Sequence, residues 1–155
     1  MSKPSDYKVP VQTVLVDNQQ STHKPAYMFD SDTSTFYHQS YIGVPGINIY
    51  FGDEMTVSRV IFVNRLNYVG YLRGLEDTKL SVIKSDGSEE YCSTLTGVNT
   101  VSQAEADQTY TLECPNTAGV GIRMDRDSAV KGWCISKLEI YGNKEVTVLS
   151  PGRKI

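Results

Sequence analysis

Short runs of β-branched and aromatic residues alternate with turn residues along most of this chain. Val57–Val63 is the densest of these runs, and Ile47–Phe51 shows the alternation of apolar and polar residues that is typical of a half-buried strand. Ser85–Gly87 and Pro115-Asn116 are turn signals between such runs. No segment repeats its apolar residues with the period of a helix of three turns. This pattern predicts roughly eight or nine short strands, and therefore an all-β, antiparallel β-sandwich or jelly roll.

The length of 155 residues is that of one domain with its own core. We expect residues 1–10 to form a flexible N-terminal arm, residues 11–149 a single domain, and residues 150–155 a tail. Pro25–Phe29 is expected to form one helical turn opened by its proline, followed by a long loop over residues 30–46. The expected strands are Val11–Val16, Ile47–Phe51, Val57–Val63, Thr78–Lys84, Tyr91–Leu95, Thr109–Cys114, Val120–Met124, Trp133–Tyr141 and, at an edge, Val146–Leu149.

Composition argues against several classes of partner and activity. The net charge of −3 lacks the basic footprint of a protein that binds nucleic acid. No apolar run approaches the length of a membrane span. Residues 1–8 contain no apolar h-region, so we expect no signal peptide here, and either a cytosolic protein or the mature part of a secreted one. No Ser/His/Asp set, paired-acid motif, phosphate loop or metal-ligand cluster stands out, which argues against an enzyme.

The Val57–Val63 strand ends abruptly and is followed by a loop rich in polar and aromatic side chains. Two guanidinium groups and two phenol rings are thereby held at the end of a rigid strand. A loop positioned in this way is a common form of binding site. The residues concerned are Asn64, Arg65, Asn67, Tyr68, Gly70, Tyr71 and Arg73.

The order and spacing of several motifs resemble the discoidin, or F5/8 type C, family, and within it most closely the fucose-binding F-type lectins (fucolectins). The resemblance covers roughly Val11 to Gly142, and it implies the galactose-binding-like, discoidin type of β-sandwich. The motifs that carry it are Ala26–Asp32, Phe36–His38, Val57–Arg65, Leu80–Val82, Tyr91-Cys92, Tyr110–Cys114 and Lys137–Gly142.

The resemblance also implies a sugar site, because F-type lectins use one histidine and two arginines to hold the hydroxyls of fucose. Guanidinium groups offer fixed, paired donors, and a neutral imidazole can donate or accept. Arg65 matches the first arginine. Arg73 lies one position later than the family motif, where Leu72 stands, and His38 is the matching histidine. The implied sugar-binding residues are His38, Tyr41, Arg65, Asn67, Tyr68, Tyr71 and Arg73, with the tyrosines as the wall of the site.

Each of these residues also has a structural interpretation, which the sequence leaves open. Arg65 could pair with a carboxylate such as Glu54 or Asp77 at the strand end. Arg73 could be a solvated loop charge, His38 could stabilise a turn, and the tyrosines could pack the loop. The family usually has aspartate where Asn67 stands, and Tyr68-Val69 replaces a pair of adjacent cysteines.

Three cysteines are present. The resemblance implies a disulfide between Cys92 and Cys114, which would require an oxidising compartment and favours an extracellular location, secreted or at the cell surface. Two buried thiols, in a cytosolic domain with reduced cysteines, are the alternative. Cys134 has no family partner in this chain and is expected to be a buried, inert thiol.

Calcium is the other feature that the resemblance raises. Asp30 and Asp32 lie in the loop that many F-type lectins wrap around Ca²⁺, which takes six to eight oxygen ligands. The family's carboxylate near the C-terminus falls at Lys137, whose ammonium would repel the ion. We therefore expect no cofactor, and a bridge from Lys137 to Asp30 or Asp32 in place of calcium.

The expected function is binding without chemistry, with a terminal sugar of the fucose or galactose type as ligand. Glycans or glycoproteins would be the partners, and avidity would come from a homo-oligomer or a longer multidomain chain. The alternative is a discoidin-type adhesion module that uses the same loops, with Leu72 and Leu75 as apolar contacts, to bind a protein or a lipid. The net charge disfavours an anionic membrane.

Overall fold

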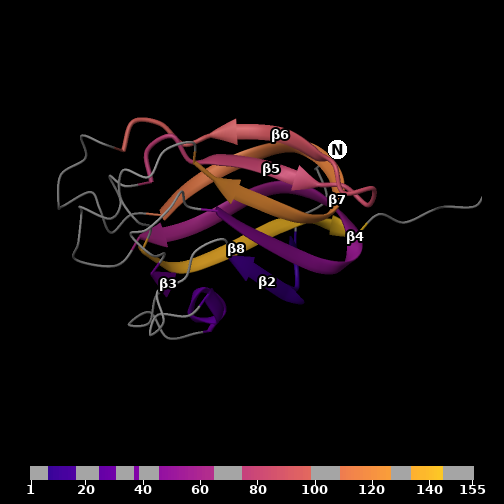
Figure 1. Cartoon of the computed structure of the whole chain (residues 1–155), viewed down its shortest axis with the longest axis horizontal. Coiled ribbons are helices and arrows are strands. Elements are labelled where there is room, and N and C mark those ends of the chain that lie inside the picture. The colour runs from indigo at the N-terminus through magenta and orange to yellow at the C-terminus, as the bar shows by residue number, and fades with distance from the viewer. Residues whose placement is uncertain are drawn as a thin grey trace, which may run out of the picture.

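A computed structural model describes residues 7–16, 25–30, 37–38, 46–64, 75–98, 109–126 and 134–144 of the chain (Figure 1). All strand pairs in these ranges are antiparallel and belong to one continuous sheet, so the predicted fold class is confirmed. Within these residues, no helix has the length and hydropathy needed to cross a membrane. The elements are β1 (Tyr7–Lys8), β2 (Thr13–Val16), the 3₁₀ helix η1 (Pro25–Phe29), β3 (Tyr37–His38), β4 (Gly46–Asn64), β5 (Lys79–Ile83), β6 (Glu89–Thr94), β7 (Thr109–Asp125) and β8 (Cys134–Lys144).

Two long, bent strands, β4 and β7, build both layers of the sandwich. The sequence predicted each of them as two separate strands, and this was wrong. In β4 the register shifts between Tyr50 and Met55, where Gly52 has a φ of 88°. In β7 the pairing with β4 is irregular between Glu113 and Thr117, and Asn116 in this interval has a φ of 52°. Bulges and positive φ values turn a strand without ending it, so the turn signals were real but the strands continue through them.

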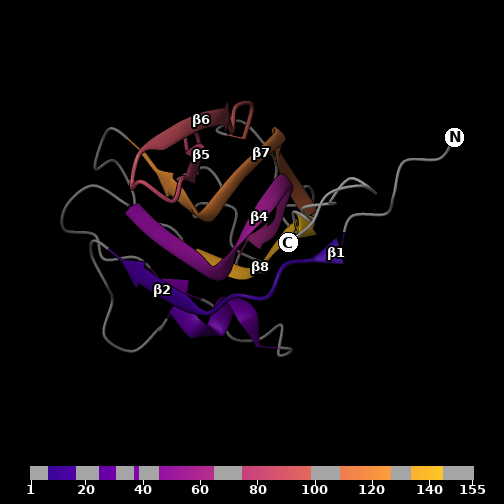
Figure 2. The same cartoon turned by 90° about the vertical axis from the view of Figure 1, so that its right-hand side faces the viewer.

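The bends in β4 and β7, which Figure 2 shows, divide the sheet into two layers. Layer one contains β2, the first half of β4, the second half of β7, β5 and β6. Layer two contains the first half of β7, the second half of β4, β8, β1 and β3.

The core lies between the layers and follows the alternation of the strands. Burial of each large apolar side chain contributes about 1.5–3 kcal/mol. Met28 of η1 is 1% exposed, so η1 closes the side of the sandwich between β2 and β8. The buried strand residues include Ile47, Ile49, Val57, Val60, Phe62, Leu80, Val82, Ile122, Met124, Leu138 and Ile140.

Two short strands lie where the sequence predicted none. Tyr7 and Lys8 pair with β8, and Val9 is 2% exposed and donates its N–H to Ile140 at 2.7 Å. Residues 7–10 are therefore part of the sandwich, not of a flexible arm. Likewise, Tyr37–His38 forms β3 inside the expected loop of residues 30–46. A strand of two residues is too short to show an alternation of apolar and polar residues, so the sequence does not predict it. Both short strands form by pairing with β8.

The predicted disulfide between Cys92 and Cys114 is present, and the alternative of two thiols is wrong. It joins β6 to β7, and Ser93 Oγ of β6 also donates to the Glu113 carbonyl of β7 at 2.7 Å. The side chain of Cys134 lies outside the described residues.

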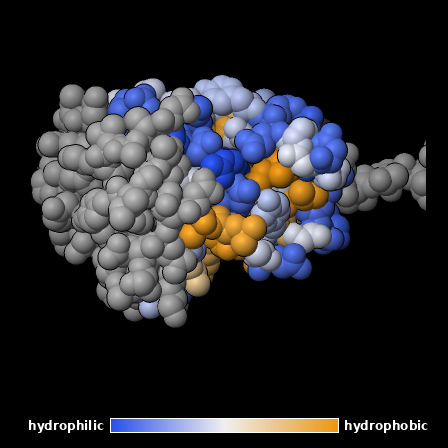
Figure 3. Space-filling model, viewed as in Figure 1, coloured by the Kyte–Doolittle hydropathy of each residue, from blue (hydrophilic) through white to orange (hydrophobic). Residues whose placement is uncertain are grey.

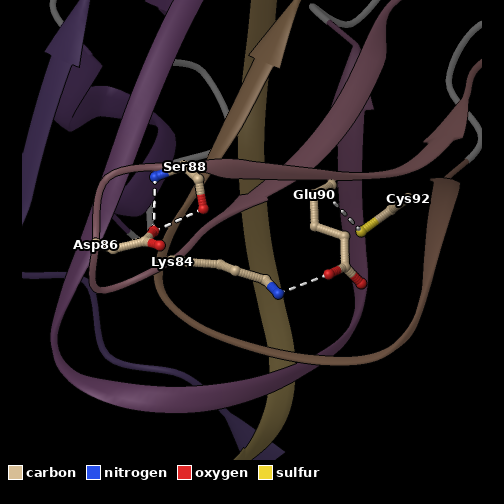
Figure 4. Close-up of polar contacts among 5 residues, drawn as sticks. All are labelled: Lys84, Asp86, Ser88, Glu90 and Cys92. Atoms are coloured by element: carbon tan, nitrogen blue, oxygen red, sulfur yellow. Dashed lines mark hydrogen bonds and ion pairs between the residues drawn. The ribbon is translucent and has the colours of Figure 1, made fainter.

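The β5–β6 hairpin is held by local contacts at its turn (Figure 4). Asp86 accepts the backbone N–H of Ser88 at 2.9 Å and its hydroxyl at 2.6 Å, and these two bonds lower the pKa of Asp86. Lys84 pairs with Glu90 at 2.8 Å, which raises the pKa of the lysine. Gly87 has a φ of 87°, as such a turn favours.

Candidate functional site

The loop end, defined here as the end of the sandwich that carries Gly46, Asn64, Thr109, Asp125 and Cys134, collects most strand termini. The register pairs Gly46 with Asp125 and Val63 with Thr109. Because β4 and β7 turn back on themselves, both termini of each lie here, at the left in Figure 1. The strand ends that the connecting segments join therefore lie at one end of the sandwich, and loops positioned by a rigid scaffold often carry binding residues.

His38 and the exit of β4 flank the start of β8. Ile135 pairs with Tyr37 on one side and with Asn64 on the other, and His38 pairs with Cys134. The backbones of His38 and Asn64 are therefore separated by two strand spacings, about 10 Å. Arg65 follows Asn64 directly in the sequence.

The side chains of the predicted sugar site lie outside the described residues. For His38 the structure describes only the backbone. Their contacts and orientations, including the interpretation of Arg65 as a partner of Glu54 or Asp77, remain predictions. The other residues outside the described ranges are Tyr41, Arg65, Asn67, Tyr68, Tyr71 and Arg73.

The segment that follows this loop is firmly held. Leu75 is 0% exposed, so it is a core residue and not the apolar contact of the lipid-binding alternative. Asp77 donates its N–H to the Leu95 carbonyl at 2.8 Å. Glu76 accepts the N–H groups of Gly97 at 3.1 Å and Val98 at 2.7 Å. Together with Asn64 at the end of β4, this turn anchors both sides of the 65–74 segment.

Arg126 directly follows β7 and interacts electrostatically with Asp77 of this turn. It is 4% exposed, and this burial lowers the pKa of its guanidinium, while the carboxylate of Asp77 acts in the opposite direction. A guanidinium stays charged over the whole physiological range, so Arg126 is a permanent positive charge close beneath the loop end.

A polar cluster on the outward face of layer one was missed by the sequence analysis. Arg123 donates to Asn48 Oδ1 at 2.8 Å and to Asp125 Oδ2 at 3.1 Å, and Asn48 donates to the Tyr50 hydroxyl at 3.2 Å. The Tyr50 ring lies against Gly121, where an added Cβ would be 3.0 Å from the ring. The alternation in Ile47–Phe51 indicated that Asn48 and Tyr50 face outward. It could not identify Arg123 as their neighbour, because that depends on the register between β4 and β7.

Lys137 forms the predicted bridge to Asp30. Its ammonium Nζ donates to Asp30 Oδ1 at 2.6 Å, and also to the carbonyl oxygens of Tyr27 at 2.8 Å and Ser136 at 2.9 Å. The bridge from Lys137 to Asp30 is thereby confirmed. Asp32 lies outside the described residues.

A surface cavity of about 580 Å³ lies between β2 and η1. Two smaller hollows adjoin it along β8, and Phe29 lines all three. Hydrophobic residues gather over β2 in Figure 3, in keeping with Leu15, which is 56% exposed. The lining of the largest cavity is mostly apolar and consists of Val11, Gln12, Val14, Pro25, Ala26, Phe29 and Asp30.

Sequence comparison alone finds no relative, since neither a family profile nor a curated protein matches the chain. Comparison of the fold finds many. The family 32 carbohydrate-binding module of NanJ from Clostridium perfringens, in complex with galactose, is 12% identical, with a TM-score of 0.71 and coverage of 88% of this chain and 98% of that chain. A mutant of the lectin binding domain of lectinolysin, complexed with Lewis b, is 10% identical, with a TM-score of 0.74 and coverage of 90% and 99%.

The serum f-lectin (fucolectin) of striped bass, Morone saxatilis, is 13% identical, with a TM-score of 0.69, and the match covers 84% of this chain and 45% of that chain. At these identities the comparisons establish the architecture. The chain has the β-sandwich fold shared by family 32 carbohydrate-binding modules and fucolectins, as the motifs in its sequence predicted.

Proposed function

We propose that this protein is a carbohydrate-binding module that recognises a terminal sugar of the fucose or galactose type at the loop end. The observation that carries the proposal is the juxtaposition of His38 with the exit of β4, immediately before Arg65, on either side of β8. Proteins of the same fold have been solved with galactose and with Lewis b, which supports sugar as the class of ligand.

The chemistry of the expected residues suits a sugar. Arg65 and Arg73 would donate paired hydrogen bonds to ring and hydroxyl oxygens, and His38 would be a third polar contact. Tyr41, Tyr68 and Tyr71 would cover the apolar C–H face, since an aromatic ring combines a flat apolar surface with a polar tip. Asn67 would add an amide that can both donate and accept.

Such a module binds without performing a reaction. The disulfide between Cys92 and Cys114 indicates an oxidising environment, so we place the protein outside the cell, where glycans and glycoproteins are available. A single sugar site binds weakly. A homo-oligomer, or further domains in a longer chain, would supply avidity.

The test is a glycan array probed with the wild-type protein and with Arg65→Ala. We expect the wild type to bind fucosylated or galactosylated glycans. The affinity of the Arg65→Ala variant for them should be at least about tenfold lower, because a charge-assisted hydrogen bond contributes roughly 1.5–3 kcal/mol to binding. Arg59→Ala is the matched control. It also removes an arginine from β4, but that guanidinium lies over the Tyr141 ring at 4.9 Å, on the face of layer two.

An array without hits from the folded wild type would refute the proposal and favour a protein ligand for the same loops. If Arg65→Ala and the wild type bound glycans with equal affinity, Arg65 would not be a sugar-binding residue. Binding of liposomes that depends on an anionic lipid would favour the alternative adhesion module.

A further inference from the structure

We propose that the ammonium of Lys137 is a built-in cation that holds η1 and β8 together where the resemblance to F-type lectins implies calcium, so that neither the fold nor its loop end depends on a metal ion. This inference does not rest on the proposed function, since it concerns how the scaffold is held.

The contacts of Lys137 form an oxygen cage around a single charge. Asp30, Tyr27 and Ser136 each place one oxygen within 2.6–2.9 Å of Nζ. An ammonium has three N–H donors, and the cage supplies an acceptor for each. The oxygens come from η1, from the residue after it and from β8 itself. The Lys137 side chain is 17% exposed, so water screens the pair less than at the surface.

The backbone of β8 is shaped to complete this cage. Lys137 pairs with Val63 of β4 and Ile135 pairs with Asn64, so Ser136 is an extra residue at a register shift. A bulge of this kind re-aims the groups around it. Ser136 is 1% exposed, and its carbonyl is an acceptor of the Lys137 ammonium. The cage therefore stands beside the β4 exit, from which the 65–74 segment leaves.

A calcium ion does not fit these residues. Calcium also seeks carboxylate and carbonyl oxygens, at 2.3–2.6 Å and in larger number, and an ammonium in their midst would repel it. Among the residues that the structure describes, no three His, Cys, Asp or Glu side chains are grouped to hold a metal. The oxygens that could begin such a site, at Tyr27 and Asp30, already receive hydrogen bonds from Lys137.

Reversing the charge should turn the cage into a metal site. In Lys137→Glu, two carboxylates would face each other beside the Tyr27 carbonyl, and they would repel unless a divalent cation came between them. Lys137→Met keeps the apolar stem of the side chain and removes the positive charge that pairs with Asp30. The two variants thus separate the loss of the native cation from the gain of a metal site.

The experiment measures Tm of the purified protein in EDTA and in excess calcium chloride. We expect the wild type to melt at the same temperature in both, and Lys137→Met to melt about 4–8 °C lower in both, as a loss of one partly buried charge pair would give in a domain of this size. Lys137→Glu should melt lower still in EDTA and recover with calcium.

Lys144→Glu is the matched control, because it makes the same change on the same strand at an exposed lysine, 3.7 Å from Asp53 but outside the cage. Its Tm should not respond to calcium. A wild-type Tm that rises with calcium, or an unchanged Tm in Lys137→Met, would overturn the proposal. If Lys137→Glu does not fold, the wild-type and Lys137→Met measurements still decide it.

Discussion

Removal of the disulfide between β6 and β7 should lower the free energy of unfolding by an amount that follows from the length of the loop it closes. We consider the double variant Cys92→Ser, Cys114→Ser. The two cysteines are separated by 22 residues in sequence. In the chain-entropy treatment, cross-linking a loop of that length lowers the free energy of the folded state relative to the unfolded chain by about 3 kcal/mol. For a domain of this size, losing it lowers Tm by about 6–12 °C.

The fold itself should survive the change. β6 still pairs with β5 along Lys79–Ile83, and Ser93 still donates to the Glu113 carbonyl at 2.7 Å. We therefore expect a native far-UV circular dichroism spectrum in the double variant. Because the bridge acts mostly on the unfolded chain, the urea dependence of the unfolding free energy should become steeper as that chain expands.

The assay is equilibrium unfolding in urea, followed by circular dichroism and by the fluorescence of the single tryptophan, Trp133. Wild-type protein treated with a reductant is the control, and it should unfold together with the double variant. If the double variant and the oxidised wild type unfold at the same urea concentration, the bridge does not constrain the unfolded chain and the reasoning is refuted.

Further predictions concern three single substitutions, two in β8 and one in the β5–β6 turn. The Tyr141 hydroxyl donates to Glu139 at 2.9 Å and, with Lys8, lowers the pKa of Glu139 below its usual 4.5. A depressed pKa stabilises the fold above about pH 4.5, and this contribution is lost as the pH falls through the folded-state pKa. In Tyr141→Phe, Tm should therefore decrease less steeply as the pH is lowered below about 4.5. An unchanged decrease would contradict this. Gly142→Ala should destabilise the fold by about 3 kcal/mol or more, because its Cβ would meet the Thr56 carbonyl oxygen of β4. Gly87→Ala, which has open space but a φ of 87°, should cost only about 1–2 kcal/mol, and urea midpoints of the two variants compare them directly.

Local chemistry explains the elements that the sequence predicted well. The 3₁₀ helix begins at Pro25 and ends at Phe29, as its proline and its length indicated. The strands expected over Ile47–Phe51 and Thr78–Lys84 are present in β4 and β5. Such signals lie within a few residues of each other, so they can be interpreted without knowing the partner strands.

The family resemblance predicted contacts between residues far apart in the sequence, which the periodicity of apolar residues could not. It implied the partner of Cys92 and the bridge from Lys137 to Asp30, which join residues 22 and 107 positions apart. The seven residues of the expected sugar site came from the same source.

By itself, then, the sequence determined the all-β class, the positions of most strands and the helical turn. Only the tertiary structure decided that β4 and β7 run through their turn signals as single strands, that Tyr7–Lys8 and Tyr37–His38 join β8, and that Asn48 meets Arg123. The physical reason is that a turn signal or a short polar segment has several local solutions of similar free energy. The choice among them depends on which hydrogen-bonding edge the rest of the sheet presents, and that edge is made by residues far away in the chain.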